Sequence, residues 1–166
     1  MTKPILVFGY GNPSRGDDAV GPLLLDYLAE HLDLSNIELL SDFQLQIEHA
    51  LDIQDREWVV FVDAAVDCPD SFTFTPLTPA QDHSYSSHAL SPAALLSVYA
   101  AVGKQAPPPC YLLSIQAEAF ELGSGLSERC AANLIEACRF ITEFLKQRPS
   151  RELPSVAKRG INSSNA

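Results

Sequence analysis

The sequence predicts a three-layer α/β fold, with a mostly parallel twisted sheet of about five strands between layers of helices. Three observations carry this prediction: strand-like and helix-like segments alternate, the strongest strands are apolar at every position, and polar residues follow the ends of those strands. Uninterrupted apolar strands are typical of a parallel sheet that is covered on both faces. At 166 residues, the chain has the length of one domain.

The first half of the chain predicts three strands and two helices. Residues 5–10 are an apolar run of β-forming residues, and GNPSRGDD follows as a loop. From Asp18 onward, apolar residues recur at helical spacing, and Pro22 falls in the first turn, where its missing N–H costs little. The other elements are a strand over residues 37–40, a short helix over LQIEHALDIQ, and a strand over residues 58–62 that ends before Asp63.

The second half of the chain predicts two strands and two helices. SFTFTP alternates like an edge strand closed by Pro76, and residues 77–89 form a polar loop. Ser91 is a preferred N-cap and Pro92 suits the first helical position, so a helix is expected from here to Val102. A buried strand over residues 111–115 and a helix from Ser127 to Leu145 complete the series.

The charge of the chain argues against an anionic partner. The formal net charge is −10, whereas a protein that binds nucleic acid or an anionic membrane needs a basic surface. We expect one domain over residues 1–147 and a basic, disordered tail over residues 148–166, because the tail has few apolar residues. An acidic domain suits a metal-handling site or a basic partner, although solubility alone explains it more simply.

Hydropathy and cysteine usage predict a cytoplasmic protein without a membrane span. No apolar run reaches the ~20 residues that a spanning helix needs, and the first residues do not resemble a secretory signal. The four cysteines form no C-x-x-C pair. We therefore expect reduced, mostly buried thiols instead of a disulfide framework or a closed zinc site.

Acidic residues follow the predicted strands at the edge where a parallel α/β sheet binds ligands. Because Asp63 comes directly after WVVFV, its ionised form needs a partner, either a loop amide or a metal cation. One of Asp17 and Asp18 is expected to cap the first helix, which leaves the other free. The candidate catalytic residues are Asp17 and Asp18 after the first strand, Asp42 after the second and Asp63 after the third.

One histidine completes a metal-binding set with two of these carboxylates. His88 lies in the polar loop between the edge strand and the following helix, and His83 is its rival. Nitrogen and oxygen donors without a thiolate suit a borderline divalent ion such as nickel or zinc in an open site. We interpret His31 and His49, which fall in predicted helices, as ordinary surface or packing residues.

The glycine loop after the first strand matches nucleotide-binding motifs only weakly. Gly9 and Gly11 fit the first two positions of G-x-G-x-x-G, but Ser14 occupies the third. Acidic residues at the start of the following helix would repel a phosphate, and Asp17 stands where a P-loop has lysine. Nucleotide binding is therefore the third hypothesis for this chain.

Three segments together resemble the motifs of the hydrogenase maturation endopeptidases. ILVFGYGNPSRGDDAVG resembles the family's N-terminal signature, VVFVDAA its second motif and SSHALSPAALLSV its third. The three segments stand in the family's order and spacing, and the predicted elements match those of the family from about Ile5 to Leu145. The resemblance implies a hydrolase on a twisted sheet flanked by helices.

The resemblance also implies a substrate and a metal. Members of the family remove a C-terminal peptide from the nickel-loaded precursor of the nickel–iron hydrogenase large subunit. Their metal-contacting residues map onto Asp18, Asp63 and His88. By the same resemblance, these residues recognise nickel that is already bound in the precursor, so the protein would hold no permanent metal. Where many members have an Asp-Gly-Gly-Thr-like stretch, this chain has SDFQLQIEHA. FQLQ, with Gln44 and Gln46 as substrate-binding candidates, resembles the subgroup that serves soluble, bidirectional NAD-linked hydrogenases.

The implied reaction is amide hydrolysis, for which two roles of the metal stay open. Nickel could polarise the scissile carbonyl or lower the pKa of an attacking water, with Asp42 or Asp17 as the base. Alternatively, nickel serves only as a recognition handle. A non-catalytic nickel-binding maturation chaperone is the second hypothesis. In either case we expect a monomer whose partner is the hydrogenase precursor.

Overall fold

The computed structural model describes residues 2–80 and 90–147 and confirms the predicted α/β architecture. The five strands form one sheet in the order β2-β1-β3-β5-β4, in which neighbours are parallel except for the antiparallel pair β4 and β5. The strands are β1 (Ile5–Tyr10), β2 (Ile37–Asp42), β3 (Trp58–Ala65), β4 (Phe72–Leu77) and β5 (Cys110–Gln116).

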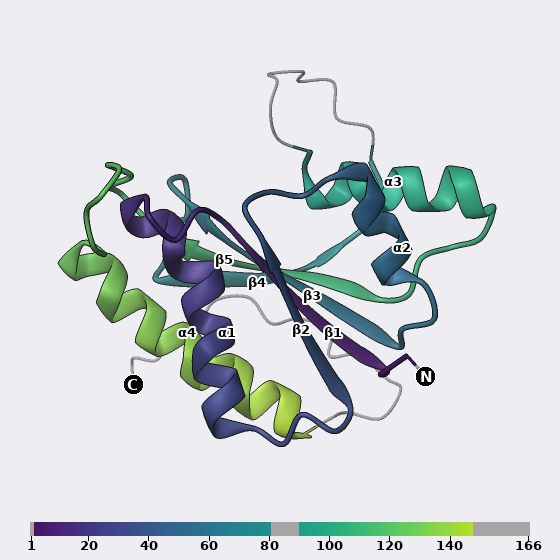
Figure 1. Cartoon of the computed structure of the whole chain (residues 1–166), viewed down its shortest axis with the longest axis horizontal. Coiled ribbons are helices and arrows are strands. Elements are labelled where there is room, and N and C mark those ends of the chain that lie inside the picture. Colours follow the sequence, from purple (N-terminus) through teal and green to yellow (C-terminus); the bar gives the residue numbers. More distant parts are fainter. Residues whose placement is uncertain (1, 81–89, 148–166) are drawn as a thin grey trace.

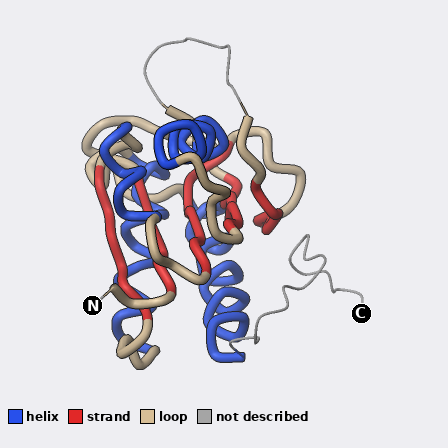
Figure 2. Tube along the Cα trace, turned by 90° about the vertical axis from the view of Figure 1, so that its right-hand side faces the viewer, coloured by secondary structure: helices blue, strands red, loops and turns tan. Residues whose placement is uncertain are grey.

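Helices cover both faces of this sheet, as Figure 1 shows. Figure 2, turned by 90°, shows the strands side by side and α3 nearly end-on. The pair α1 and α4 packs on one face, and α2 and α3 pack on the other. The helices are α1 (Val20–His31), α2 (Ala50–Ile53), α3 (Pro92–Gly103) and α4 (Glu128–Gln147), with the 3-10 helices η1 (Gly16–Ala19) and η2 (Ile47–His49) before α1 and α2.

The alternation of side chains along β1 explains why the chain has two apolar cores. Val7 faces the core beneath α1 and α4, while Leu6 and Phe8 face the core beneath α2 and α3. Successive side chains of a strand point to opposite faces, so a strand buried on both faces must be apolar throughout. The same rule places Tyr10, two residues after Phe8, on the α2 and α3 face.

Two glycines allow α1 to approach β1 closely. A Cβ atom on Gly9 would lie 2.6 Å from the carbonyl oxygen of Gly21, and a Cβ atom on Gly21 would lie 2.9 Å from the backbone of Tyr10. Such distances exclude a side chain at either position. The first turn of α1 therefore lies directly against the carboxyl end of β1, where the loop before it holds the predicted acidic residues.

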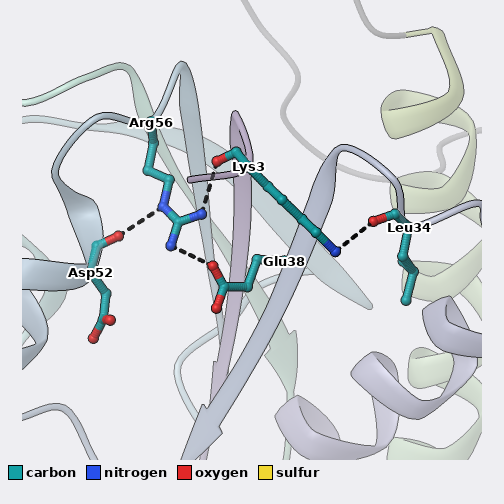
Figure 3. Close-up of polar contacts among 5 residues, drawn as sticks. All are labelled: Lys3, Leu34, Glu38, Asp52 and Arg56. Atoms are coloured by element: carbon teal, nitrogen blue, oxygen red, sulfur yellow. Dashed lines mark hydrogen bonds and ion pairs between the residues drawn. The ribbon is translucent and has the colours of Figure 1, made fainter. Parts of the chain in front are cut away.

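At the amino-terminal edge of the sheet, where the parallel strands begin, Arg56 links neighbouring segments of the chain. Its side chain is only 5% exposed. Figure 3 shows its guanidinium donating to the backbone oxygens of Asp52 and Lys3 and forming an ion pair with Glu38 at 2.7 Å. Lys3 Nζ donates to the backbone oxygen of Leu34. The cluster joins the segment after α2 to the start of β1 and to β2, with each charge matched by hydrogen-bonding partners.

Several predicted boundaries are wrong. β2 continues to Asp42 and β3 to Ala65, so Asp42 and Asp63 lie within strands and not after them. The predicted helix over LQIEHALDIQ is divided into η2 and α2, since the chain enters a capped turn at Gln46. β4 runs through Pro76, which an edge strand tolerates because no ladder hydrogen bond is needed there.

The expectation of mostly buried thiols is confirmed for the described residues. All four cysteines are free and buried. No helix in the described residues is long and apolar enough to span a bilayer. The predicted tail, residues 148–166, lies outside the described residues.

Candidate active site

The sheet brings Asp42, Tyr10, Asp63 and Ser114 into one row across four strands. Tyr10 is paired with Asp42 in register, Asp63 is paired with Ser114, and the β1–β3 pairing ends one residue before Tyr10 and Asp63. Residues in register on neighbouring parallel strands point to the same face, which here is the face covered by α2 and α3. The row lies at the carboxyl ends of β1 and β3, where the strand order reverses and open α/β sheets bind ligands.

Asp63 is half-buried, and its two carboxylate oxygens differ in their partners. The Tyr10 hydroxyl donates to its Oδ2 at 3.0 Å, whereas Oδ1 is buried without a hydrogen bond within the described part of the chain. Burial raises the pKa of Asp63 to about 6; the nearby Tyr10 and Ser114 hydroxyls lower the pKa, and the negative charge of Asp18 raises it. A buried carboxylate oxygen without a donor is the feature expected of a group that meets a cation or a reacting proton.

Asp18 lies close enough to Asp63 for its charge to act on that carboxyl group. The backbone N–H of Asn12 donates to Asp18 Oδ2 at 2.7 Å. Gly11 makes this contact possible: its φ is 145°, and a Cβ atom there would lie 2.1 Å from the backbone oxygen of Asp18. The turn after β1 thus closes onto Asp18 and presents its carboxylate beside the row.

Asp17 has a structural role that the sequence did not indicate. Its side chain is fully buried and accepts hydrogen bonds from the backbone N–H groups of Glu118, Ala119 and Ser127 and from the Ser127 hydroxyl, at 2.7 to 3.0 Å. Burial alone would raise the pKa of Asp17, but these hydrogen bonds outweigh it and the pKa is lowered. A carboxylate with four donors has little capacity left to accept a proton.

The expected capping of the first helix by Asp17 or Asp18 is wrong. Neither η1 nor α1 has a side-chain cap. Both carboxylates instead reach backbone N–H groups elsewhere, Asp18 that of the preceding turn and Asp17 those of the loop before α4. The physical reason is that Asp17 and Asp18 lie inside the 3-10 helix η1, so neither occupies an N-cap position, which falls to Arg15 for η1 and to Ala19 for α1.

Asp42 forms a pair with His49 that sequence reasoning missed. His49 Nε2 lies 3.2 Å from Asp42 Oδ2, and the backbone N–H of Gln46 donates to His49 Nδ1 at 2.8 Å. Because Nδ1 accepts a hydrogen bond, a neutral His49 carries its proton on Nε2 and donates it to Asp42. The backbone N–H of Phe43 donates to the other oxygen of Asp42 at 2.7 Å. The sequence signal was the capping pattern Gln46 to His49 just after a strand that ends in an acid.

The ring of His49 also packs edge-to-face on the ring of Phe8, with centroids 4.6 Å apart. His31, in contrast, is exposed and stacks on Tyr27, as a surface histidine does. Among the substrate-binding candidates, Gln44 and Gln46 are both exposed in the segment after Asp42. The loop that carries them therefore begins at the end of the row.

The described residues bring together part of the predicted metal set. Asp18 and Asp63 are close, but His88 and its rival His83 lie outside the described residues. Among the residues that the structure describes, no three histidine, cysteine or acidic side chains form a group able to hold a metal. The unpaired Oδ1 of Asp63, with the charge of Asp18 beside it, still fits a divalent cation brought by a ligand.

No protein-family model matches the sequence, and no curated protein matches it. Solved structures, in contrast, do match the chain over most of its length. The hydrogenase maturating endopeptidase HybD from E. coli aligns with a TM-score of 0.69 at 22% identity, covering 87% of this chain and 93% of that chain. The chain has the fold of the hydrogenase maturation endopeptidases.

Two archaeal structures agree with this comparison. The [NiFe] hydrogenase maturation protease HycI from Thermococcus kodakarensis KOD1 aligns with a TM-score of 0.67 at 24% identity, over 87% of this chain and 93% of that chain. The hydrogenase 2 maturation peptidase from Thaumarchaeota archaeon SCGC_AB-539-E09 gives 0.63 at 23% identity, over 87% and 99%. The likeness extends over nearly the whole of these chains, so the candidate site lies within the shared fold.

Proposed function

We propose that the protein is an endopeptidase that removes the C-terminal peptide from the nickel-loaded precursor of a nickel–iron hydrogenase large subunit. The observation that carries this proposal is Asp63, with a buried, unpaired oxygen and a pKa raised to about 6, beside Asp18 at the switch point of the sheet. The hydrogenase maturation proteases that share the fold supply the class of substrate.

In this proposal the nickel belongs to the substrate. Asp18, Asp63 and His88 are the residues that would contact it, and two carboxylates with an imidazole are a suitable donor set for a borderline divalent ion. A divalent cation can polarise a carbonyl group or lower the pKa of a bound water. The two roles considered for the metal, chemistry and recognition, both require Asp18 and Asp63 to face it.

Asp42 is a better candidate for the general base than Asp17. The four hydrogen bonds to Asp17 stabilise its ionised form and occupy its oxygens. Asp42 is partly exposed at the end of β2, two strands from Asp63, or about 10 Å across the sheet. His49 and the N–H of Phe43 fix its orientation, which is what a positioned base requires.

The segment after Asp42 is the proposed region of substrate selectivity. Gln44 and Gln46 offer amide groups for an extended peptide, and Phe43 and Ile47 are large apolar side chains left 63% and 61% exposed. We propose that this surface contacts the precursor, and that the precursor belongs to a soluble, NAD-linked hydrogenase. The four free cysteines suit a reducing compartment, so we place the reaction in the cytoplasm.

The test is to incubate the protein with nickel-loaded and nickel-free precursor and to measure the intact mass of the precursor. Loss of a C-terminal peptide only from the nickel-loaded form supports the endopeptidase. Binding without a loss of mass supports the maturation chaperone instead. If His88→Ala processes the loaded precursor at the wild-type rate, the proposed nickel contact is wrong. Thermal stabilisation by NAD or ATP would favour a nucleotide-binding module.

A further inference from the structure

Tyr10 stands at the centre of the row, between Asp42 and Asp63, as the last residue of β1. Its ring packs edge-to-face on Phe8, with centroids 6.2 Å apart and an interplanar angle of 80°, and belongs to the core beneath α2 and α3. An aromatic ring held in this way by the strand and the core has little freedom to turn. The position of its hydroxyl group is therefore set by the fold.

The hydroxyl of Tyr10 determines how the carboxylate of Asp63 is oriented. It donates to Oδ2 at 3.0 Å, and this leaves Oδ1, which is buried and has no hydrogen bond within the described residues. Without the Tyr10 hydroxyl, the Asp63 carboxylate would keep only the nearby Ser114 hydroxyl and would rotate more freely about its last torsion, since such torsions are broad and roughly two-fold. Burial, followed by the charge of Asp63, raises the pKa of Tyr10 well above its usual value, so the phenol remains a donor.

The turn after β1 also holds one carboxylate oxygen of Asp18 by a hydrogen bond. The backbone N–H of Asn12, two residues after Tyr10, donates to Asp18 Oδ2 at 2.7 Å. The turn over residues 10–12 thus holds one oxygen of each carboxylate and leaves the other oxygen of each for a ligand. Both hydrogen bonds go to carboxylate oxygens, and such bonds are stronger than those between neutral groups when the carboxylate carries its charge.

We infer that Tyr10 is a positioning residue that acts through Asp63 and presents the Oδ1 atom of that carboxylate to a divalent cation. The inference rests on the proposed function only for the source of the cation. A donor behind a ligating carboxylate fixes its direction, and loss of such a donor typically weakens metal affinity or activity by about 10- to 100-fold. Removing the Tyr10 hydroxyl should therefore have this effect although Tyr10 does not touch the metal.

The test compares Tyr10→Phe with Tyr99→Phe as a matched control. Tyr99 lies in the core that Tyr10 packs against, but its hydroxyl accepts a hydrogen bond from the side-chain amide of Gln105, at 3.4 Å, whereas that of Tyr10 donates to Asp63. Ni²⁺ alone is titrated into each purified full-length protein by calorimetry, and kcat and KM are then measured on the nickel-loaded precursor. We expect Tyr10→Phe to bind Ni²⁺ about 10-fold more weakly or worse, with kcat/KM lowered to match. Tyr99→Phe should equal the wild type in both.

The outcomes separate this inference from the proposed function. If the wild type cleaves the precursor and Tyr10→Phe equals it in Ni²⁺ affinity and in kcat/KM, Tyr10 has no positioning role and the proposed function stands. If the wild type does not cleave the precursor, the proposed function is wrong, while the titrations still decide the role of Tyr10. Thermal unfolding of both variants provides the check on folding. A Tyr10→Phe protein that loses Ni²⁺ affinity only in proportion to an unfolded fraction also contradicts the inference.

Discussion

Two carboxylates near the same edge of the sheet, the fully buried Asp17 and the half-buried Asp63, have opposite surroundings. Asp17 accepts four hydrogen bonds from the loop before α4, and its pKa is lowered. Asp63 leaves one buried oxygen without a hydrogen bond within the described residues, and its pKa is raised to about 6. The first arrangement stabilises the fold, and the second destabilises it. A carboxylate that is kept buried and unsatisfied is the one to expect in a functional site.

The amino-terminal edge of the sheet strengthens this contrast. There Arg56 is almost completely buried, and hydrogen bonds or an ion pair serve each of its three nitrogens. The fold is thus able to satisfy a buried charge at either edge, as Arg56 and Asp17 show. Among the described residues two buried side-chain oxygens lack a hydrogen bond, Asp63 Oδ1 and Thr142 Oγ1, and of these only Asp63 Oδ1 belongs to an ionisable group.

Asp17→Ala should give the largest loss of stability. Three backbone N–H groups and a hydroxyl would lose their acceptor in the interior, and each unsatisfied buried donor costs about 1–3 kcal/mol. With some relaxation of the loop, we expect the free energy of unfolding to fall by roughly 3–5 kcal/mol, measured by chemical denaturation. Asp33→Ala is the control, because Asp33 also accepts two hydrogen bonds but lies in an exposed turn. Equal losses in the two variants would contradict the structural role of Asp17.

Asp63→Asn should raise the free energy of unfolding, by an amount that depends on pH. The folded-state pKa of Asp63 lies above the unfolded value, so the folded protein binds this proton more tightly. Above about pH 6 the group is ionised in both states, and its burial costs on the order of 3 kcal/mol. Below about pH 4 it is protonated in both states and the cost disappears.

The amide that replaces the carboxylate in Asp63→Asn carries no charge, so we expect this variant to be more stable than the wild type near pH 8. The gain should shrink as the pH falls from about 6 to about 4. Denaturation midpoints at several pH values measure this difference. A variant that is less stable than the wild type at pH 8 would show that Asp63 is satisfied in the folded protein, contrary to the account given above.

Ser127→Ala should have the smallest effect of the three. The hydroxyl donates to Asp17 and accepts from the backbone N–H of Cys130, so the change removes one of the four bonds to Asp17 and the cap of α4. Loss of such a cap typically costs about 1–2 kcal/mol. Ser127→Thr, which keeps the hydroxyl, should recover most of the stability. Failure of Thr to recover it would indicate that packing, and not the hydrogen bonds, matters at this position.

Most of the fold was predictable because its signals are local. Apolar strands such as residues 58–62, and caps such as Ser91 with Pro92, predict elements that the structure contains. The convergence of Asp42 and Asp63 followed from parallel topology alone, since carboxyl ends of parallel strands meet at one edge. The order of the strands and their ends were less accessible, because they depend on packing between distant segments.

The roles within the site were harder to predict for the same reason. Asp17 and Asp18 are adjacent in the chain, yet Asp17 meets residues about 100 positions away and Asp18 meets Asn12. Nothing in the sequence distinguishes the two. The contacts of Tyr10 with Asp63 and of His49 with Asp42 likewise exist only once β1, β2 and β3 are paired.

The most direct test of the central claim is the cleavage of nickel-loaded precursor by Asp63→Asn, followed by intact mass. The account predicts that Asp63→Asn is folded and at least as stable as the wild type at pH 8. It also predicts that this variant does not cleave the precursor, which therefore keeps its full mass. Loss of the C-terminal peptide at the wild-type rate would contradict the claim that the unsatisfied carboxylate of Asp63 is kept for function.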